Sequence, residues 1–160
     1  MSSQVLSGQA STAVACWARL LRGGAAVRRN LSAKLQSQHG LSLNDYEALL
    51  VLARAEDGRM RRVDLASELV LTASGVTRML DGLESGGLVE KASCASDLRV
   101  TYAVLTDKGR AALDSAAADH FAAIGELFEE RFTPEELEQL AQLLARLPES
   151  GAEDGSSCSP

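Results

Sequence analysis

Residues 63–83 constrain the fold more strongly than any other stretch of the chain. Residues 63–69 have the spacing of a short helix whose inward positions are Leu65, Ala66 and Leu69. Thr72 is a residue type preferred at a helix N-cap, and it opens a second helix. The apolar positions of that helix are Val76, Met79, Leu80 and Leu83. A three-residue separation and a small side chain at the crossing, Ala66, predict a helix-turn-helix.

The opposite side of the second helix is polar, and it carries Ser74, Thr77, Arg78 and Asp81. By itself this pattern favours an ordinary solvated helix surface. Small polar groups and one cation near a helix N-terminus also suit a helix that reads base edges in the major groove of DNA. The segments that follow the helix decide between these two interpretations.

Those segments predict a β-hairpin. Gly86-Gly87 ends the second helix, because glycine adopts the left-handed conformation that helix ends commonly need. Residues 88–92 and 100–105 have the composition of strands, and they flank a polar loop at residues 93–99. Helix, turn, helix and hairpin together predict a winged helix over residues 41–110, and with it DNA contact becomes the better interpretation of the polar face.

The rest of the chain is predicted to be helical. One long helix covers residues 10–38 and ends at His39-Gly40, although Gly23-Gly24 interrupt its pattern as a kink or a close helix crossing. A second helix covers residues 43–55, and Thr106 caps a long helix that reaches residue 131, with Leu113 and Phe121 among its apolar positions. Thr133 begins the last helix with a capping box. We expect one mainly α domain with a small β-hairpin, and a disordered tail at residues 148–160.

Several short motifs resemble the MarR family of bacterial transcriptional regulators. They are S-G-V-T-R at 74–78, G-L-V-E-K at 87–91, D-L-R at 97–99 and L-T-D-K-G at 105–109. The resemblance covers residues 10–147 and implies a winged helix-turn-helix that binds double-stranded DNA. The candidate DNA-binding residues are Arg62, Thr72, Ser74, Thr77, Arg78, Lys91, Asp97 and Arg99. Asp97 is expected to orient Arg99 for the minor groove, and the alternative is a simple surface turn pair.

The terminal helices, residues 10–40 and 111–147, predict a homodimer. A winged helix of this size has its own core, which leaves the apolar faces of these helices uncovered. A two-fold dimer would bury them, as the resemblance also implies. Two recognition helices would then lie about one DNA turn apart on a pseudo-palindromic operator, where the protein would act as a repressor. A ligand with different affinities for two spacings of these helices would release the DNA.

The net charge of −6 does not exclude DNA binding, because the acidic residues are unevenly distributed. Residues 111–160 hold eleven acidic and two basic side chains, whereas residues 54–110 hold nine of each. Charges are screened over about 8 Å at physiological salt. The local charge of the binding face therefore matters more than the total.

Two mechanisms of control remain open. The first is a small aromatic, weakly acidic effector in a pocket formed by Trp17, Tyr46 and His120, where the dimer layer meets the winged helix. The second is oxidation of Cys16, which has Arg19 three residues on, with Cys94 as the alternative thiol. We favour the ligand, because the peroxide sensors of the family usually have Cys-Phe where this chain has Cys16-Trp17.

Other classes of function find little support. The sequence has no Gly-rich phosphate loop, no G-x-S-x-G and no H-E-x-x-H, so we expect neither an enzyme nor a cofactor. His39, His120 and the three cysteines lack metal-ligand spacing. No signal-peptide pattern or membrane-length apolar run occurs, so a cytoplasmic protein with no membrane partner is expected. A winged helix used only for protein contacts stays open.

Overall fold

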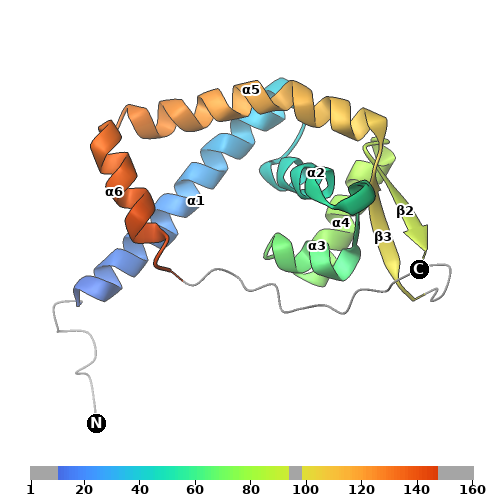
Figure 1. Cartoon of the computed structure of the whole chain (residues 1–160), viewed down its shortest axis with the longest axis horizontal. Helices are drawn as coiled ribbons and strands as arrows, with labels where there is room; N and C mark the ends of the chain where they lie inside the picture. The colour runs from blue at the N-terminus through green and yellow to red at the C-terminus, as the bar shows by residue number, and fades with distance from the viewer. Residues whose placement is uncertain (1–10, 94–98, 148–160) are drawn as a thin grey trace, which may run out of the picture.

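The computed structural model describes residues 11–93 and 99–147, and its overall shape is an arch (Figure 1). The long helices α1 and α5 pack against each other, and a winged helix gathers beneath the N-terminal end of α5 while α6 descends from the other end. The elements in chain order are α1 (Thr12–His39), α2 (Leu43–Arg54), η1 (Glu56–Gly58), β1 (Arg59–Arg61), α3 (Arg62–Glu68), α4 (Ala73–Ser85), β2 (Val89–Ser93), β3 (Thr101–Leu105), α5 (Asp107–Glu129) and α6 (Pro134–Leu144).

Side-chain caps set the helix boundaries. The Oγ1 atoms of Thr72, Thr106 and Thr133 accept backbone N–H groups in the first turns of α4, α5 and α6, as the sequence predicts. Thr133 completes its capping box with Glu136. Gly40 ends α1 with a φ of 68°, which confirms the predicted stop. These local signals explain why the helices were found close to their observed bounds.

The mainly α fold with a small hairpin is confirmed, but the sheet has one strand more than predicted. β2 and β3 pair antiparallel from Val89 with Leu105 to Ser93 with Thr101, within one residue of the predicted strands. β1 pairs antiparallel with the other edge of β3, in the order β1-β3-β2. The sequence indicated only a connection there, because the strand has three residues and two of them are arginines. The guanidinium of Arg59 lies 4.8 Å from the centroid of the Tyr102 ring, across the strand pair.

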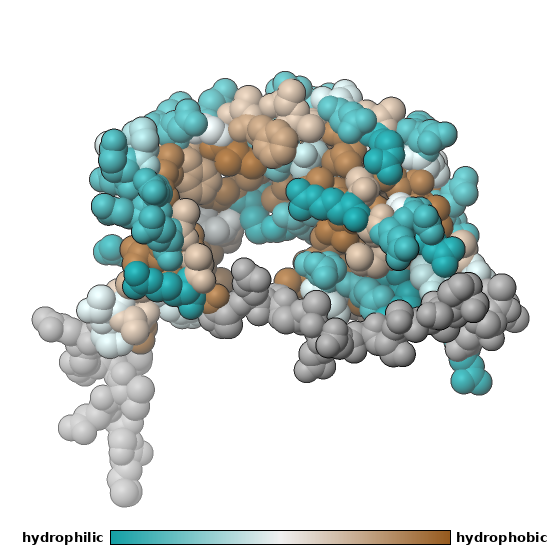
Figure 2. Space-filling model, in the orientation of Figure 1, coloured by the Kyte–Doolittle hydropathy of each residue, from teal (hydrophilic) through white to brown (hydrophobic). Residues whose placement is uncertain are grey.

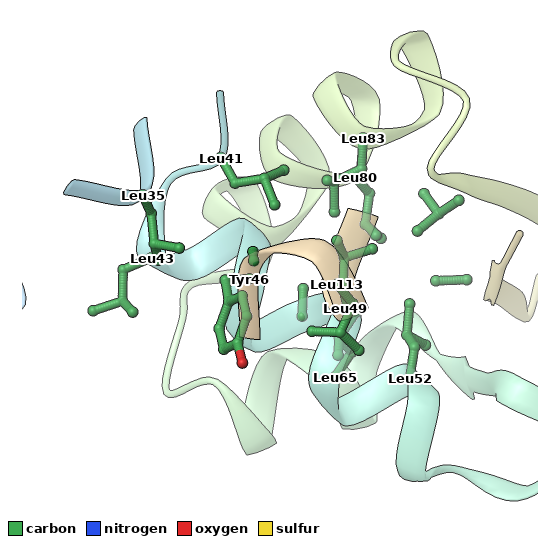
Figure 3. Packing of buried hydrophobic residues seen from close by; sticks show 14 of the residues in the cluster. Leu35, Leu41, Leu43, Tyr46, Leu49, Leu52, Leu65, Leu80, Leu83 and Leu113 are labelled. Atoms are coloured by element: carbon green, nitrogen blue, oxygen red, sulfur yellow. The ribbon is translucent and has the colours of Figure 1, made fainter. Parts of the chain in front are cut away.

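The buried core lies in the winged helix and reaches the C-terminal end of α1. Leucines from five helices meet there: Leu35 of α1, Leu49 and Leu52 of α2, Leu65 of α3, Leu80 and Leu83 of α4, and Leu113 of α5 (Figure 3). Several of them are fully buried, which is worth about 1.5–3 kcal/mol for each side chain of this size. This core holds the helix-turn-helix against the long helices.

The L-T-x-x-G motif fastens α5 to the winged helix. Thr106 Oγ1 donates to the carbonyl of Gly87 at 2.7 Å and accepts the N–H of Gly109 at 3.0 Å. Gly109 is buried, and a Cβ placed there would lie 2.0 Å from the carbonyl oxygen of Leu88. Only glycine permits this approach, so the motif has a structural explanation.

The other half of the arch leaves large apolar side chains uncovered. Trp17 is 62% exposed and Leu21 57% exposed on α1, and Phe121 of α5 is 64% exposed. Figure 2 shows brown side chains under the arch, beside the hollow between α6 and the winged helix. Phe121, one of the predicted apolar positions of α5, is not covered within the described chain, and His120, one residue earlier, lies on the buried face of the helix.

Gly23 and Gly24 do not interrupt α1, which is continuous from Thr12 to His39. A Cβ at either glycine would meet no atom of the described chain within 4 Å. The predicted interruption at these glycines is therefore wrong, and they do not mark a close helix crossing within the described part of one chain.

Candidate nucleic-acid interface

The helix-turn-helix consists of α3 and α4 joined by a tight turn. The N–H of Leu71 donates to the carbonyl of Ala66 at 3.0 Å, and the N–H of Val70 donates to the carbonyl of Ser67. Val70 has a φ of 52° and is 77% exposed. A β-branched residue in the left-handed region is strained, by about 1–3 kcal/mol. This strain could not be predicted from the sequence, because glycine or asparagine is the residue expected at such a position.

Helix α4 has the two faces that its sequence predicts. Val76, Leu80 and Leu83 are buried in the core. Ser74, Arg78 and Asp81 are exposed on the other side. The polar face is therefore available to a partner, and it begins in the first turn of the helix, where backbone N–H groups also favour anions.

Three hydroxyl groups and one guanidinium lie close together at this end of α4. Thr72 Oγ1 accepts the N–H of Gly75 at 3.1 Å and lies 3.3 Å from Ser74 Oγ. Thr77 Oγ1 donates to the carbonyl of Ala73 at 2.9 Å, and Arg62 Nη1 points to the same oxygen at 3.5 Å. Thr72 is thus the helix cap, and Arg62 brings a charge from α3 to the polar face of α4.

The two remaining arginines of the prediction are exposed. Arg78 is in no ion pair with another residue of the described chain. Arg99 lies just before β3, at the base of the hairpin loop. Asp97, the expected partner of Arg99, lies outside the described residues, as does Cys94, so their predicted roles remain predictions.

Lys91 on β2 occupies a different environment from the other candidates. Its ammonium lies 2.5 Å from an Asp81 oxygen and 2.9 Å from a Glu84 oxygen, both carboxylates belonging to α4. These two hydrogen bonds raise the pKa of Lys91. The structure therefore gives Lys91 a role in holding the hairpin against α4, which the sequence did not indicate.

The predicted effector residues do not form one pocket within the described chain. The rings of Tyr46 and His120 stack with centroids 4.4 Å apart, and both residues are buried. Burial lowers the pKa of His120, whose Nδ1 has no hydrogen-bond partner among the described residues. Trp17 lies in the N-terminal half of α1, about 20 Å along the helix from Leu31 at 1.5 Å per residue, and remains exposed. The expectation that Trp17 joins Tyr46 and His120 is wrong for the single chain.

A cavity of about 580 Å³ lies instead between α1, α2 and the turn of the helix-turn-helix. Arg28 closes one side, donating to both carboxylate oxygens of Glu47 at 2.9 Å and to Asn44 Oδ1 at 2.7 Å. The apolar lining is Leu50, Val51, Leu69, Val70 and Leu71, with Glu68 beside it. The cavity thus lies between α1, α2 and the turn of the helix-turn-helix, and none of the three predicted residues lines it.

Cys16 is exposed on α1, next to Trp17. Nothing in its described surroundings tests the predicted oxidation. No helix among residues 11–93 and 99–147 is long and apolar enough to cross a membrane.

The comparisons with known proteins agree with this geometry. A family model described as "MarR family" matches residues 39–99, which run from the end of α1 through α2, β1 and the helix-turn-helix to β2 and stop before β3. AbsC, a MarR family transcriptional regulator from Streptomyces coelicolor, is 31% identical, with a TM-score of 0.73 over 86% of this chain and 92% of its own. The chain belongs to the MarR family of transcriptional regulators. The family resemblance seen in the motifs is thereby confirmed.

Other relatives extend the comparison. The repressor YetL of Bacillus subtilis is 31% identical over 108 residues, which are 68% of this chain and 64% of that protein, less than two thirds of its length. Sco3205 of Streptomyces coelicolor, solved in complex with DNA, is 28% identical with a TM-score of 0.74 over 82% of each chain. CouR of Rhodococcus jostii, solved with p-coumaroyl-CoA, is 27% identical with a TM-score of 0.66 over 86% of this chain and 93% of its own. Sco3205 and CouR thus share the overall fold of this chain.

Proposed function

We propose that this regulator is a homodimeric repressor that binds a pseudo-palindromic operator through α4 and the hairpin. The observation that carries the proposal is the exposed polar face of α4, with Ser74, Thr77 and Arg78 on it and Arg62 beside it. The Sco3205 complex supports DNA as the partner, and the name of YetL supports repression. Ser74, Thr77 and Arg78 contact the major groove, and Arg99 the minor groove.

The dimer is supported by the uncovered apolar side chains of the arch. Leu143, Leu144 and Leu147 are exposed near the C-terminal end, as Trp17 and Leu21 are on α1. Contiguous apolar surface of this kind is uncommon on a soluble monomer. A second copy that packs its own α1, α5 and α6 against these residues would bury it and bring two α4 helices to one face. Light scattering at micromolar concentration should give twice the chain mass, and a monomer mass would contradict the proposal.

DNA binding is tested by selecting bound duplexes from a random library and measuring affinity on the selected sequence. Arg78→Ala should weaken binding by about 1–3 kcal/mol and relax the sequence preference, because Arg78 reads a base. Arg99→Ala should reduce the slope of the logarithm of the binding constant against the logarithm of the salt concentration by about one if Arg99 contacts a phosphate. Arg146→Ala, far from the winged helix in sequence and exposed, is the matched control. Binding by all variants that equals the parent would contradict the assignment.

The effector site is proposed at the cavity rather than at Trp17, Tyr46 and His120. An aromatic carboxylate fits its composition, since apolar side chains line it and Arg28 stands at its side. Such a ligand would compete with Glu47 for the guanidinium of Arg28 and thereby loosen the link between α1 and α2. It would release DNA because it binds better to the arrangement in which this link is open.

The ligand and redox mechanisms separate in a DNA-release assay. Salicylate or a related phenolic acid should release both the parent and Cys16→Ser, and Arg28→Met should need a higher ligand concentration. Peroxide should release neither protein. Release of the parent by peroxide, with Cys16→Ser spared, would favour oxidation of Cys16 over the ligand.

A further inference from the structure

The side chain of Thr77 has two chemically different ends, and the structure commits one of them. Its hydroxyl hydrogen is used in the bond to the carbonyl of Ala73 at 2.9 Å, one turn back along α4. A hydroxyl group has a single hydrogen to donate. The side chain therefore has no donor left for a base edge while this bond is made.

The acceptor side of the same oxygen is also approached. Arg62 Nη1 lies 3.5 Å from Thr77 Oγ1 and points to it from the start of α3. An adenine or cytosine amino group would have to compete with this guanidinium for the oxygen. The hydroxyl hydrogen and one of the two acceptor sites of the oxygen thus face the protein, whereas the methyl group makes neither of these bonds.

The neighbouring side chains of the polar face differ from Thr77 in the contacts that they can make to a base. Thr72 Oγ1 is occupied by the helix cap, and Ser74 and Arg78 are exposed beside Thr77 on α4. Ser74 and Arg78 can form hydrogen bonds, whereas Thr77 offers an apolar contact. The apolar group that identifies a base in the major groove is the C5 methyl of thymine.

We propose that Thr77 is a specificity residue that recognises thymine through contact between its methyl group and the thymine C5 methyl. The bonds to Ala73 and Arg62 fix the rotamer that presents this methyl group. The inference rests on the proposed binding of DNA by α4 and adds the chemical nature of one base contact in each half-site.

The test uses two variants that each remove one end of the side chain. Thr77→Val keeps a methyl at the same place and removes the hydroxyl, and Thr77→Ser keeps the hydroxyl and removes the methyl. The probe is the duplex selected by the parent protein, in which each thymine in turn is replaced by deoxyuridine to remove only the C5 methyl. Thermal unfolding of both variants verifies that they are folded.

At one thymine in each half-site, replacement by deoxyuridine should weaken binding by the parent about fourfold. This factor corresponds to the free energy of burying one methyl group, about 0.8 kcal/mol. Thr77→Val should bind as tightly as the parent and show the same loss at the same position. Thr77→Ser should bind the thymine duplex about fifteenfold more weakly, because the dimer loses one methyl contact in each half-site, and it should be indifferent to deoxyuridine there.

Two results would overturn the inference. The first is a folded Thr77→Val that loses affinity for the operator while Thr77→Ser keeps it. That outcome would show that the hydroxyl group, and not the methyl group, contacts the base. The second is a parent protein indifferent to deoxyuridine at every position. Failure of the parent to select any sequence would instead contradict the proposed function, so the two failures are distinguishable.

Discussion

Gly109→Ala tests the close contact between α5 and the beginning of the hairpin. The added Cβ would lie 2.0 Å from the Leu88 carbonyl oxygen and 2.8 Å from Leu105 Cδ1. Carbon and oxygen atoms normally approach no closer than about 3.3 Å, so the backbone has to separate by more than an ångström. The Leu88 carbonyl also accepts the N–H of Thr106 at 3.2 Å, and that hydrogen bond would be stretched by the movement.

The steric cost exceeds the gain in helix propensity. Alanine in a helix interior is favoured over glycine by about 1 kcal/mol. Overpacking costs about 1–3 kcal/mol, and a lost buried hydrogen bond costs about 1 kcal/mol more. We therefore expect a net loss of about 2 kcal/mol in the free energy of unfolding, which lowers Tm by about 4–8 °C for a chain of this size.

The matched control is Gly82→Ala in α4, where a Cβ meets nothing within 4 Å in the described structure. This variant should raise the free energy of unfolding by about 0.4–1 kcal/mol. Both are measured by urea and thermal unfolding at one protein concentration, because association shifts apparent stability. A Gly109→Ala variant as stable as the parent would contradict the predicted steric clash. So would a change of stability in the same direction for Gly109→Ala and Gly82→Ala.

Three further predictions follow from single contacts. Lys91→Met should weaken DNA binding in titrations, because the negative charge of Asp81 would then face the DNA phosphates uncompensated. Adding Asp81→Asn should restore most of the affinity. Failure of this second substitution to restore binding would instead make Lys91 itself a phosphate contact. Burial lowers the pKa of His120 in the folded state, so the contribution of His120 to stability is complete above about pH 6.5 and is lost as the pH falls toward the lowered pKa. In urea unfolding, His120→Phe should therefore lose less stability than the parent between about pH 7 and pH 5. Equal losses for the two proteins would contradict this prediction. Leu21→Glu should shift the proposed dimer to monomer in light scattering, whereas Arg19→Glu, exposed on the same helix, should shift it less.

The sequence predicted the elements whose signals are local. Thr106 and Thr133 begin their helices because one side chain caps one turn, and that chemistry is visible in a few consecutive residues. Strand β1 was missed because its stability comes from pairing with β3, more than forty residues later, rather than from its own three residues. Local chemistry is visible in the sequence, whereas pairing between distant segments is not.

The inward side of α5 shows a second limit. Its sequence has apolar residues on more than one side, and spacing alone groups Leu113 and Phe121 as apolar positions of one helix. In the folded chain, Leu113, Ala116, His120 and Ala123 form the buried side. A helix that serves two partners carries two apolar faces, and the choice between them depends on tertiary packing. The cavity beside α2 was not predicted, since the turn at Val70 that lines it has no local signal.

Helix α5 is the element through which events at the long helices can reach the DNA-reading surface. Its first turn is fixed to the winged helix, where Lys108 Nζ donates to the Gly86 carbonyl at 2.7 Å beside the Thr106 and Gly109 contacts. Further along, it is joined to α1 by the ion pair Lys34–Glu126 and by the hydrogen bond between His39 and Asp119, whose acidic members are exposed. Exposed pairs of this kind are each worth at most about 1 kcal/mol. These polar pairs therefore add little to the apolar packing between α1 and α5, in which Leu31, Leu35 and Ala123 are buried. A rearrangement of the long helices should carry the winged helix with it, because the first turn of α5 is fixed to the start of the hairpin.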